Sequence, residues 1–188
     1  MSMRQTIAVI SQMEADGIIG RYAIGGAVAS FLYVDVAITE DLDILVALHN
    51  EAATSGLITL GPITKYLAEK GFPEFRNEGI VVHGWPVRFL PVADSLDEEG
   101  LQEAIVTELP IDRETTVSCR VLRAEHLMAK ALAVGRPKDH VRLTQFVEVG
   151  RYDAQYLCEV LDRHGLSAKW RAFCERFDVT DPCSRPKP

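Results

Sequence analysis

The sequence predicts an α/β (α+β) protein, with a mixed sheet flanked by helices and a C-terminal helical region. Short apolar runs alternate with helix-like segments over the first two thirds of the chain. One run, Ile44 to Val46, is apolar at consecutive positions, as is typical of a strand buried on both faces. From Ala124 onward the pattern is helical, with glycine or proline between the segments. We therefore expect an α/β core over residues 1–122, a helical region over 123–180 packed on it, and a tail over 181–188.

The first elements are expected to be helix, strand, glycine turn, helix and strand. Residues 3–16 have apolar side chains at three-residue spacing, which predicts an amphipathic helix. A short apolar strand over 22–24 leads directly into Gly25-Gly26, and residues 27–35 have helical composition. The run over 42–48 is the best candidate for a central strand.

The next elements are expected to be two helices and three strands. Helices are predicted over 58–70 and 95–108, and strands over 80–83, 87–92 and 115–122. Pro62 lies near the start of the first helix, and Ser95-x-x-Glu98 is a capping signature for the second. Gly84-Trp85-Pro86 separates two β-prone runs, which predicts a hairpin. Four helices should follow Ala124.

Composition excludes several classes of protein. The formal charge of −7 opposes broad attraction to nucleic acid or anionic membranes. Because no window approaches the length of a spanning helix and the N-terminus lacks a signal-peptide pattern, we expect a cytoplasmic protein without membrane contact. The four cysteines form no C-x-x-C pair, so buried or idle thiols are expected rather than zinc ligands.

Two acidic residues and a glycine pair form the candidate site. Asp41 and Asp43 are two apart in a predicted strand, so both carboxylates should share one face, where they could bind Mg²⁺. Gly25 and Gly26 connect a strand to a helix without side chains that would block a phosphate. Each feature alone is weak, because glycine at a turn is usually geometric and acidic pairs are often only solvated. Their combination in this order is more specific.

These motifs resemble the nucleotidyltransferase superfamily. Its pattern is an apolar residue, Gly, then Gly or Ser, followed after a dozen or so residues by Asp-apolar-Asp-apolar. Here Ile24-Gly25-Gly26 precedes Asp41-Leu42-Asp43-Ile44 by fourteen residues. The run Glu125 to Lys130, followed by Arg136-Pro137-Lys138-Asp139, is similar to the AbiEii-like branch, known partly as toxins of bacterial abortive-infection systems. The matches span about residues 20 to 140.

The resemblance implies a role for each matched residue. Asp41 and Asp43 would bind Mg²⁺, and the glycine turn would hold a nucleoside triphosphate. Lys130 would reach the phosphates, and Asp139 would act as a base or as an anchor for basic residues. The candidate nucleotide contacts are Gly25, Gly26, Ser30, Thr39, Lys130, Arg136 and Lys138. Without the family, the basic residues and Asp139 would be interpreted as ordinary charges at helix ends.

One departure from the family pattern leaves the activity open. The third carboxylate is expected on the strand over 86–91, where the matching residue is Arg88, and Arg142 replaces a further acid. Glu74, Glu78 or Asp94 could complete the site. The first hypothesis is Mg²⁺-dependent transfer of a nucleotidyl group to an unknown acceptor (RNA, protein or small molecule), with a cognate antitoxin as a candidate partner. The alternative is a catalytically degenerate nucleotide-binding regulatory or interaction module, in which Arg88 pairs with Asp41 or Asp43. A purely structural protein ranks last.

Overall fold

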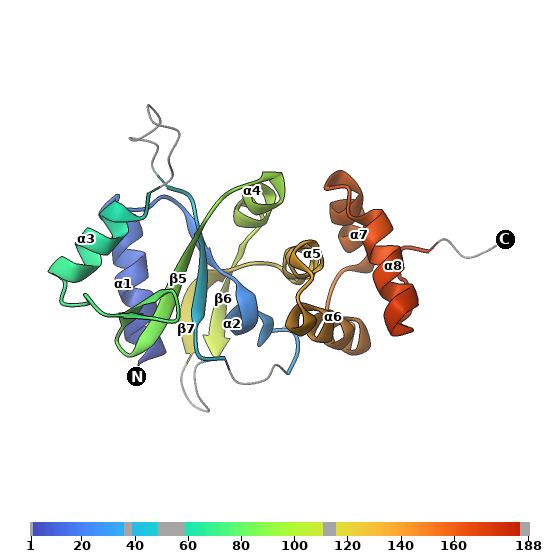
Figure 1. The fold of residues 1–188 in the computed structure, drawn as a ribbon, viewed down its shortest axis with the longest axis horizontal. Helices are drawn as coiled ribbons and strands as arrows, with labels where there is room; N and C mark the ends of the chain where they lie inside the picture. The colour runs from blue at the N-terminus through green and yellow to red at the C-terminus, as the bar shows by residue number, and fades with distance from the viewer. Residues whose placement is uncertain (1, 36–38, 49–58, 111–115, 185–188) are drawn as a thin grey trace. The chain divides into compact units, whose positions relative to one another are not determined.

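The computed structural model describes residues 2–35, 39–48, 59–110 and 116–184 (Figure 1). The chain forms two compact units. The first, here called the α/β unit, consists of Met1–Ala29 and Ile38–Leu122. The second, here called the helical unit, consists of Ser30–Ala37 and Arg123–Pro188. Within the described residues, no helix is both long and apolar enough to cross a lipid bilayer.

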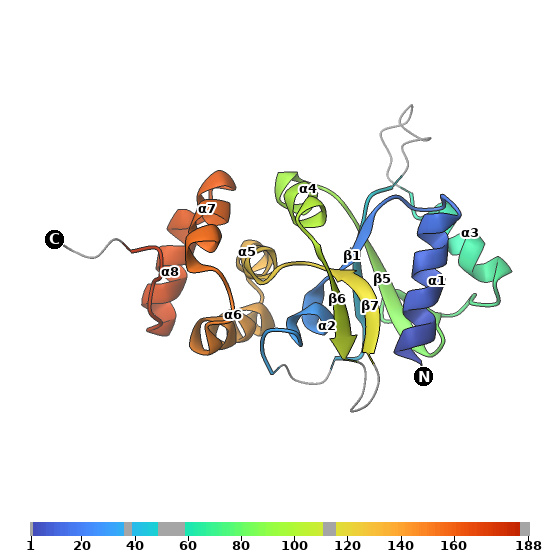
Figure 2. The ribbon, with the colours of Figure 1, turned by 180° about the vertical axis from the view of Figure 1, so that it is seen from behind.

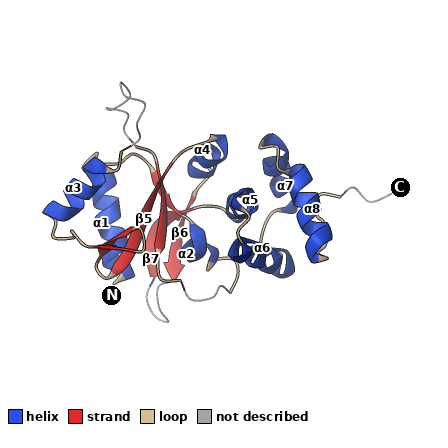
Figure 3. Ribbon diagram, in the orientation of Figure 1, coloured by secondary structure: helices blue, strands red, loops and turns tan. Residues whose placement is uncertain are grey.

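A seven-stranded mixed sheet forms the centre of the α/β unit (Figure 3). The strands are β1 Tyr22–Ile24, β2 Leu42–Val46, β3 Phe75–Arg76, β4 Gly79–Val82, β5 Trp85–Pro91, β6 Ile105–Pro110 and β7 Thr116–Val121. Their order in the sheet is β3-β4-β5-β2-β1-β7-β6. β2 is parallel to β5 and antiparallel to β1, and β1 is parallel to β7. The predicted mixed sheet is confirmed, and β2 lies at its middle.

Helices cover both sides of this sheet. They are α1 Met3–Ala15, α2 Gly26–Ser30, α3 Gly61–Glu69 and α4 Ser95–Gln102. α1 and α3 lie on one side of the strands and α2 lies on the other (Figure 1 and Figure 2). The buried residues of α1 include Ile7, Ile10 and Met13, which confirms the predicted three-residue spacing. α2 is shorter than the helix predicted up to residue 35, and the predicted start of α3 at Ile58 lies outside the described residues.

Two tight hairpins connect β3, β4 and β5. Asn77 and Glu78 have φ of 49° and 64°, and His83 and Gly84 have φ of 47° and 88°. Positive φ at both central residues defines the type I′ turn, whose twist matches that of the flanking strands. The predicted hairpin between β4 and β5 is confirmed, but its turn comes earlier than predicted because β5 already begins at Trp85.

The helix predicted over 95–108 is wrong in its second half. α4 ends at Gln102, and β6 then pairs antiparallel with β7. The run Ile105-Val106-Thr107 is β-branched and favours a strand, and the partner strand supplies hydrogen bonds that the local pattern does not encode. The start of α4 also differs, because the carboxylate of Asp94 is the cap and accepts a hydrogen bond from Asp97 N at 2.8 Å.

The helical unit contains the four helices that the sequence predicts after Ala124. They are α5 Ala124–Val134, α6 Pro137–Val149, α7 Ala154–Arg163 and α8 Ser167–Phe177. Gly135 and Gly150 cap the C-termini of α5 and α6 with left-handed φ of 71° and 69°, a conformation that costs glycine little. Trp170 is 1% exposed and belongs to the core of this unit.

A disulfide, absent from the sequence-based expectation, links α7 to the segment after α8. Cys158 and Cys183 are bonded across a sequence separation of 25 residues. Cys119 and Cys174 are free and buried, as expected. No short sequence motif marks this pair as a disulfide. The two cysteines are far apart in the sequence and come together only because the chain turns after α8.

Candidate functional site

β2 positions the two candidate carboxylates. Asp43 lies between Leu42 and Ile44, both fully buried, so strand alternation directs its side chain to the opposite face of the sheet. Asp41 directly precedes the strand, and its side chain is 27% exposed. The predicted sharing of one face is therefore consistent with the observed strand.

β5 brings Arg88 to the same place. Asp43 and Arg88 are direct partners in the parallel pairing of β2 with β5. Arg88 Nε and Nη2 donate hydrogen bonds to Asp43 Oδ1 at 2.8 and 2.6 Å. Arg88 Nε also lies 3.3 Å from Asp41 Oδ2. One guanidinium therefore bridges both acids, on the strand where the family pattern expects a third carboxylate.

The alternative carboxylates do not supply a third acid in this structure. Glu74 and Glu78 are exposed, before β3 and in the turn that follows it, and Asp94 caps α4. Among the described residues, no group of three or more His, Cys, Asp or Glu side chains could hold a metal ion. Within the part of the chain that the structure describes, Arg88 therefore lies where the sequence comparison with the family expects a third carboxylate, and no other acid replaces it.

The oxygen atoms at this site are already engaged within the chain. Asp43 Oδ1 and Asp41 Oδ2 face Arg88, and the hydroxyl of Thr39 donates to Asp41 Oδ1 at 2.9 Å. Asp43 Oδ2 is packed against Gly26. Mg²⁺ requires a near-ideal octahedron of oxygens about 2.1 Å away. Among the described residues the arrangement does not fit a two-metal centre, because both carboxylates are paired with Arg88 and no third acid joins them.

The glycine turn touches this cluster directly. Gly25 N donates to the backbone oxygen of Asp43 at 2.9 Å. Gly26 has a φ of 58°, and a Cβ atom there would collide with Asp43 Oδ2 and lie 2.9 Å from Asp43 Cγ. Gly26 is therefore explained by the approach of a carboxylate and by its backbone conformation, without reference to a phosphate. Thr39 belongs to the same cluster through its bond to Asp41.

The remaining predicted site residues belong to the helical unit. Ser30 is fully buried, and its carbonyl accepts from the backbone N–H groups of residues 33 and 34. Lys130 is half-buried in α5, and Lys138 is exposed in α6. Asp139 is 1% exposed and accepts bonds from Arg136 Nε at 2.7 Å, Nη2 at 3.1 Å and backbone N at 3.2 Å. Asp139 thus accepts the backbone N–H of Arg136 at the start of α6 and anchors its guanidinium.

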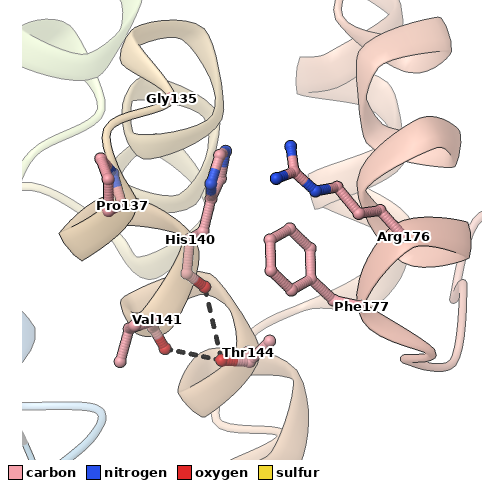
Figure 4. Close-up of a pocket in the computed structure, with 7 residues that line it drawn as sticks. All are labelled: Gly135, Pro137, His140, Val141, Thr144, Arg176 and Phe177. Carbon is pink, nitrogen blue, oxygen red and sulfur yellow. Dashed lines mark hydrogen bonds between the residues drawn. The ribbon is translucent and has the colours of Figure 1, made fainter.

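The helical unit also has a pocket that the sequence did not indicate. It has a volume of about 510 Å³ and lies between α6 and the end of α8 (Figure 4). Its walls include His140 and Arg176, whose side chains point toward each other, and Phe177 beside them. The His140 and Phe177 rings are 5.1 Å apart, and Arg176 lies 5.3 Å from the Phe177 ring. A scattered histidine and the end of a helix carry no sequence pattern that predicts such a pocket.

Comparison with known proteins gives structural likenesses only. No protein-family model and no curated protein matches the chain. Among solved structures it is similar to an antigenic nucleotidyltransferase-like protein from Paracoccidioides brasiliensis, with a TM-score of 0.48 and 17% identity over 92% of this chain and 91% of that one. It is also similar to the antibiotic-resistance factor ANT(2'')-Ia, with a TM-score of 0.41 and 16% identity over 94% and 95% of the two chains. The functional assignment therefore depends on the residues of the site.

Proposed function

We propose that the chain binds a nucleoside triphosphate at a nucleotidyltransferase-type site without transferring its nucleotidyl group. It would then act as a regulatory or interaction module. The observation that supports this proposal is the bridging of Asp43 and Asp41 by Arg88, at the position where a third carboxylate is expected. A guanidinium cannot ligate a metal or accept a proton from an attacking hydroxyl, but it is a strong ligand for phosphate oxygens.

The charge of the cluster sets a condition on binding. Two carboxylates and one guanidinium leave one net negative charge, which opposes a triphosphate unless further cations take part. Mg²⁺ that accompanies the triphosphate could supply this charge. Binding should therefore weaken when divalent cations are removed.

The role of the carboxylates can be tested by calorimetry with ATP and GTP, in Mg²⁺ and in EDTA. If Asp43 only holds Arg88, Asp43→Asn should keep binding or strengthen it, because one negative charge is removed. If Asp43 ligates a metal, the same change should abolish Mg²⁺-dependent binding.

Arg88→Ala should reduce affinity at least tenfold under the proposal. Arg76→Ala, which removes an exposed arginine of β3, is the matched control. Absence of triphosphate binding by the wild type would refute the proposal.

The second candidate function is the Mg²⁺-dependent transfer reaction itself. It is favoured by the placement of Asp41 and Asp43 around one guanidinium. We test it by incubating the protein with α-labelled triphosphates, Mg²⁺ and cellular RNA, protein or small molecules. Label transfer by the wild type that is lost in Asp41→Asn and Asp43→Asn would establish the enzyme and would identify the acceptor. A toxin role would then be tested by growth arrest and by its relief with a co-purifying antitoxin.

A further inference from the structure

The Cys158–Cys183 disulfide lies where a small molecule can reach it. Both cysteines are half-buried, and both line a pocket of about 640 Å³ in the helical unit. Other parts of the wall are polar and include Ser167, Arg171 and Asp181. Reaction at a disulfide requires that a thiolate approach one sulfur along the S–S axis, so access of this kind separates reducible from inert disulfides.

The two free cysteines differ sharply from this pair. Cys119 and Cys174 are 6% and 4% exposed. Burial raises the pKa of Cys119 to about 11 and that of Cys174 to about 12. The thiol form is a poor nucleophile, so neither residue should compete in exchange with the bonded pair near neutral pH.

The disulfide ties a short segment, Asp181–Ser184, to α7, and a hydrogen bond ties the same segment to α8. Trp170 Nε1 and Cys183 N both donate to Asp181 Oδ1 at 2.9 Å. The Ser184 hydroxyl donates to the Asp181 carbonyl at 2.8 Å, which closes the segment into a compact turn. The position of Asp181 against the buried Trp170 indole is therefore coupled to the bond between Cys183 and α7.

We propose that Cys158–Cys183 is a reversible redox modification site that exchanges with small thiols of the glutathione class. A thiolate attacks one sulfur, the S–S bond breaks, and a mixed disulfide forms while the other cysteine leaves as a thiolate and takes up a proton. A second small thiol attacks the mixed disulfide and releases the second cysteine thiol. The protein gains two electrons and two protons, and two small thiols are oxidised to one disulfide. Reduction loosens Asp181–Ser184 from Trp170.

The exchange can be measured on the full chain by intact mass. The protein is equilibrated in buffers with different ratios of reduced to oxidised glutathione and then alkylated without denaturant. We expect no adduct in the oxidised buffer and two in the reduced buffer, at Cys158 and Cys183, with Cys119 and Cys174 modified only in denaturant. Two reactive thiols in the oxidised buffer, resistance of the pair to excess reduced glutathione, or native modification of Cys174 would overturn the proposal.

The loosening of the segment has a separate optical test. In a Trp85→Phe background, Trp170 is the remaining tryptophan of the chain. Its emission should shift on reduction, and Cys158→Ser should show the shifted emission in both buffers. If that variant does not fold, the same comparison is made between the reduced and the oxidised forms of the Trp85→Phe protein. Unchanged Trp170 emission after complete reduction would show that the segment stays docked.

Discussion

At the scale of single residues, replacement by alanine should cost much more stability at Gly26 than at the adjacent Gly25. Gly26→Ala adds a Cβ that collides with the Asp43 carboxylate and imposes a left-handed φ on alanine, so we expect a loss of about 2 kcal/mol or more of unfolding free energy. Gly25→Ala adds a Cβ that meets Leu122 Cδ1 at 3.4 Å, an ordinary contact. We expect that loss to stay below about 1 kcal/mol. Urea unfolding of both variants makes the comparison, and equal losses would contradict it.

The pKa values of the buried cysteines predict a decline in stability at alkaline pH. Cys119 and Cys174 have pKa values raised from 9.0 to about 11 and about 12, because burial penalises the thiolate. A folded-state pKa above the unfolded value stabilises the protein fully below pH 9, and this contribution is lost as the pH rises through 11 and 12. The free energy of unfolding should therefore fall with pH in this window. Cys119→Ala should make the fall shallower, and an identical pH slope in wild type and variant would refute the assignment.

The sequence predicts many of the residues of the candidate site, but it does not predict which contacts they make. Gly25 and Gly26 both lie against Asp43, and Asp41 is linked to Asp43 through Arg88. The interpretation of Gly26 as a phosphate contact could not be distinguished from close packing, because a glycine has no side chain that reports its neighbour. The pairing of Arg88 depends on the register of β5 beside β2, and a shift of one residue would reverse its facing.

At the scale of elements, the hydrogen bonds of Asp139 at the start of α6 indicate a structural role for this residue. Asp139→Ala removes three hydrogen bonds to Arg136 and leaves its buried site empty, so we expect a loss of about 2 kcal/mol of unfolding free energy. Lys138→Ala, one residue earlier and exposed, should cost less than about 0.5 kcal/mol. Thermal or urea unfolding tests the pair. Unchanged stability of Asp139→Ala would contradict the structural explanation.

Helices and strands can be predicted when a local sequence pattern specifies them. The prediction fails when a strand depends on pairing with another strand. α1, α6 and β2 follow from apolar spacing, a proline at the first helical turn and a consecutive apolar run. β6 does not, because Leu101 to Glu108 is compatible with a continued helix until β7 is available to pair with it. Val106 is 71% exposed, so this strand at the sheet edge forms through its backbone hydrogen bonds and not through burial of that side chain.

At the scale of the whole molecule, the disulfide should affect the two units unequally. It closes a loop with a sequence separation of 25 residues, and both of its cysteines lie in the helical unit. Restriction of the unfolded chain by such a loop is worth about 3 kcal/mol. Reduction should therefore lower the stability of the helical unit by roughly this amount, while the α/β unit keeps its own sheet and core.

Each unit contains its own optical reporter for this prediction. Trp85 lies in β5 of the α/β unit, and Trp170 lies in α8 of the helical unit. Trp170→Phe leaves the first as the reporter, and Trp85→Phe leaves the second. Urea titrations with and without reductant should show a lower midpoint for Trp170 after reduction and a smaller change for Trp85. Equal shifts at both tryptophans would mean that the two units unfold as one cooperative body, since a cross-link confined to one unit can destabilise the other only if their unfolding is coupled.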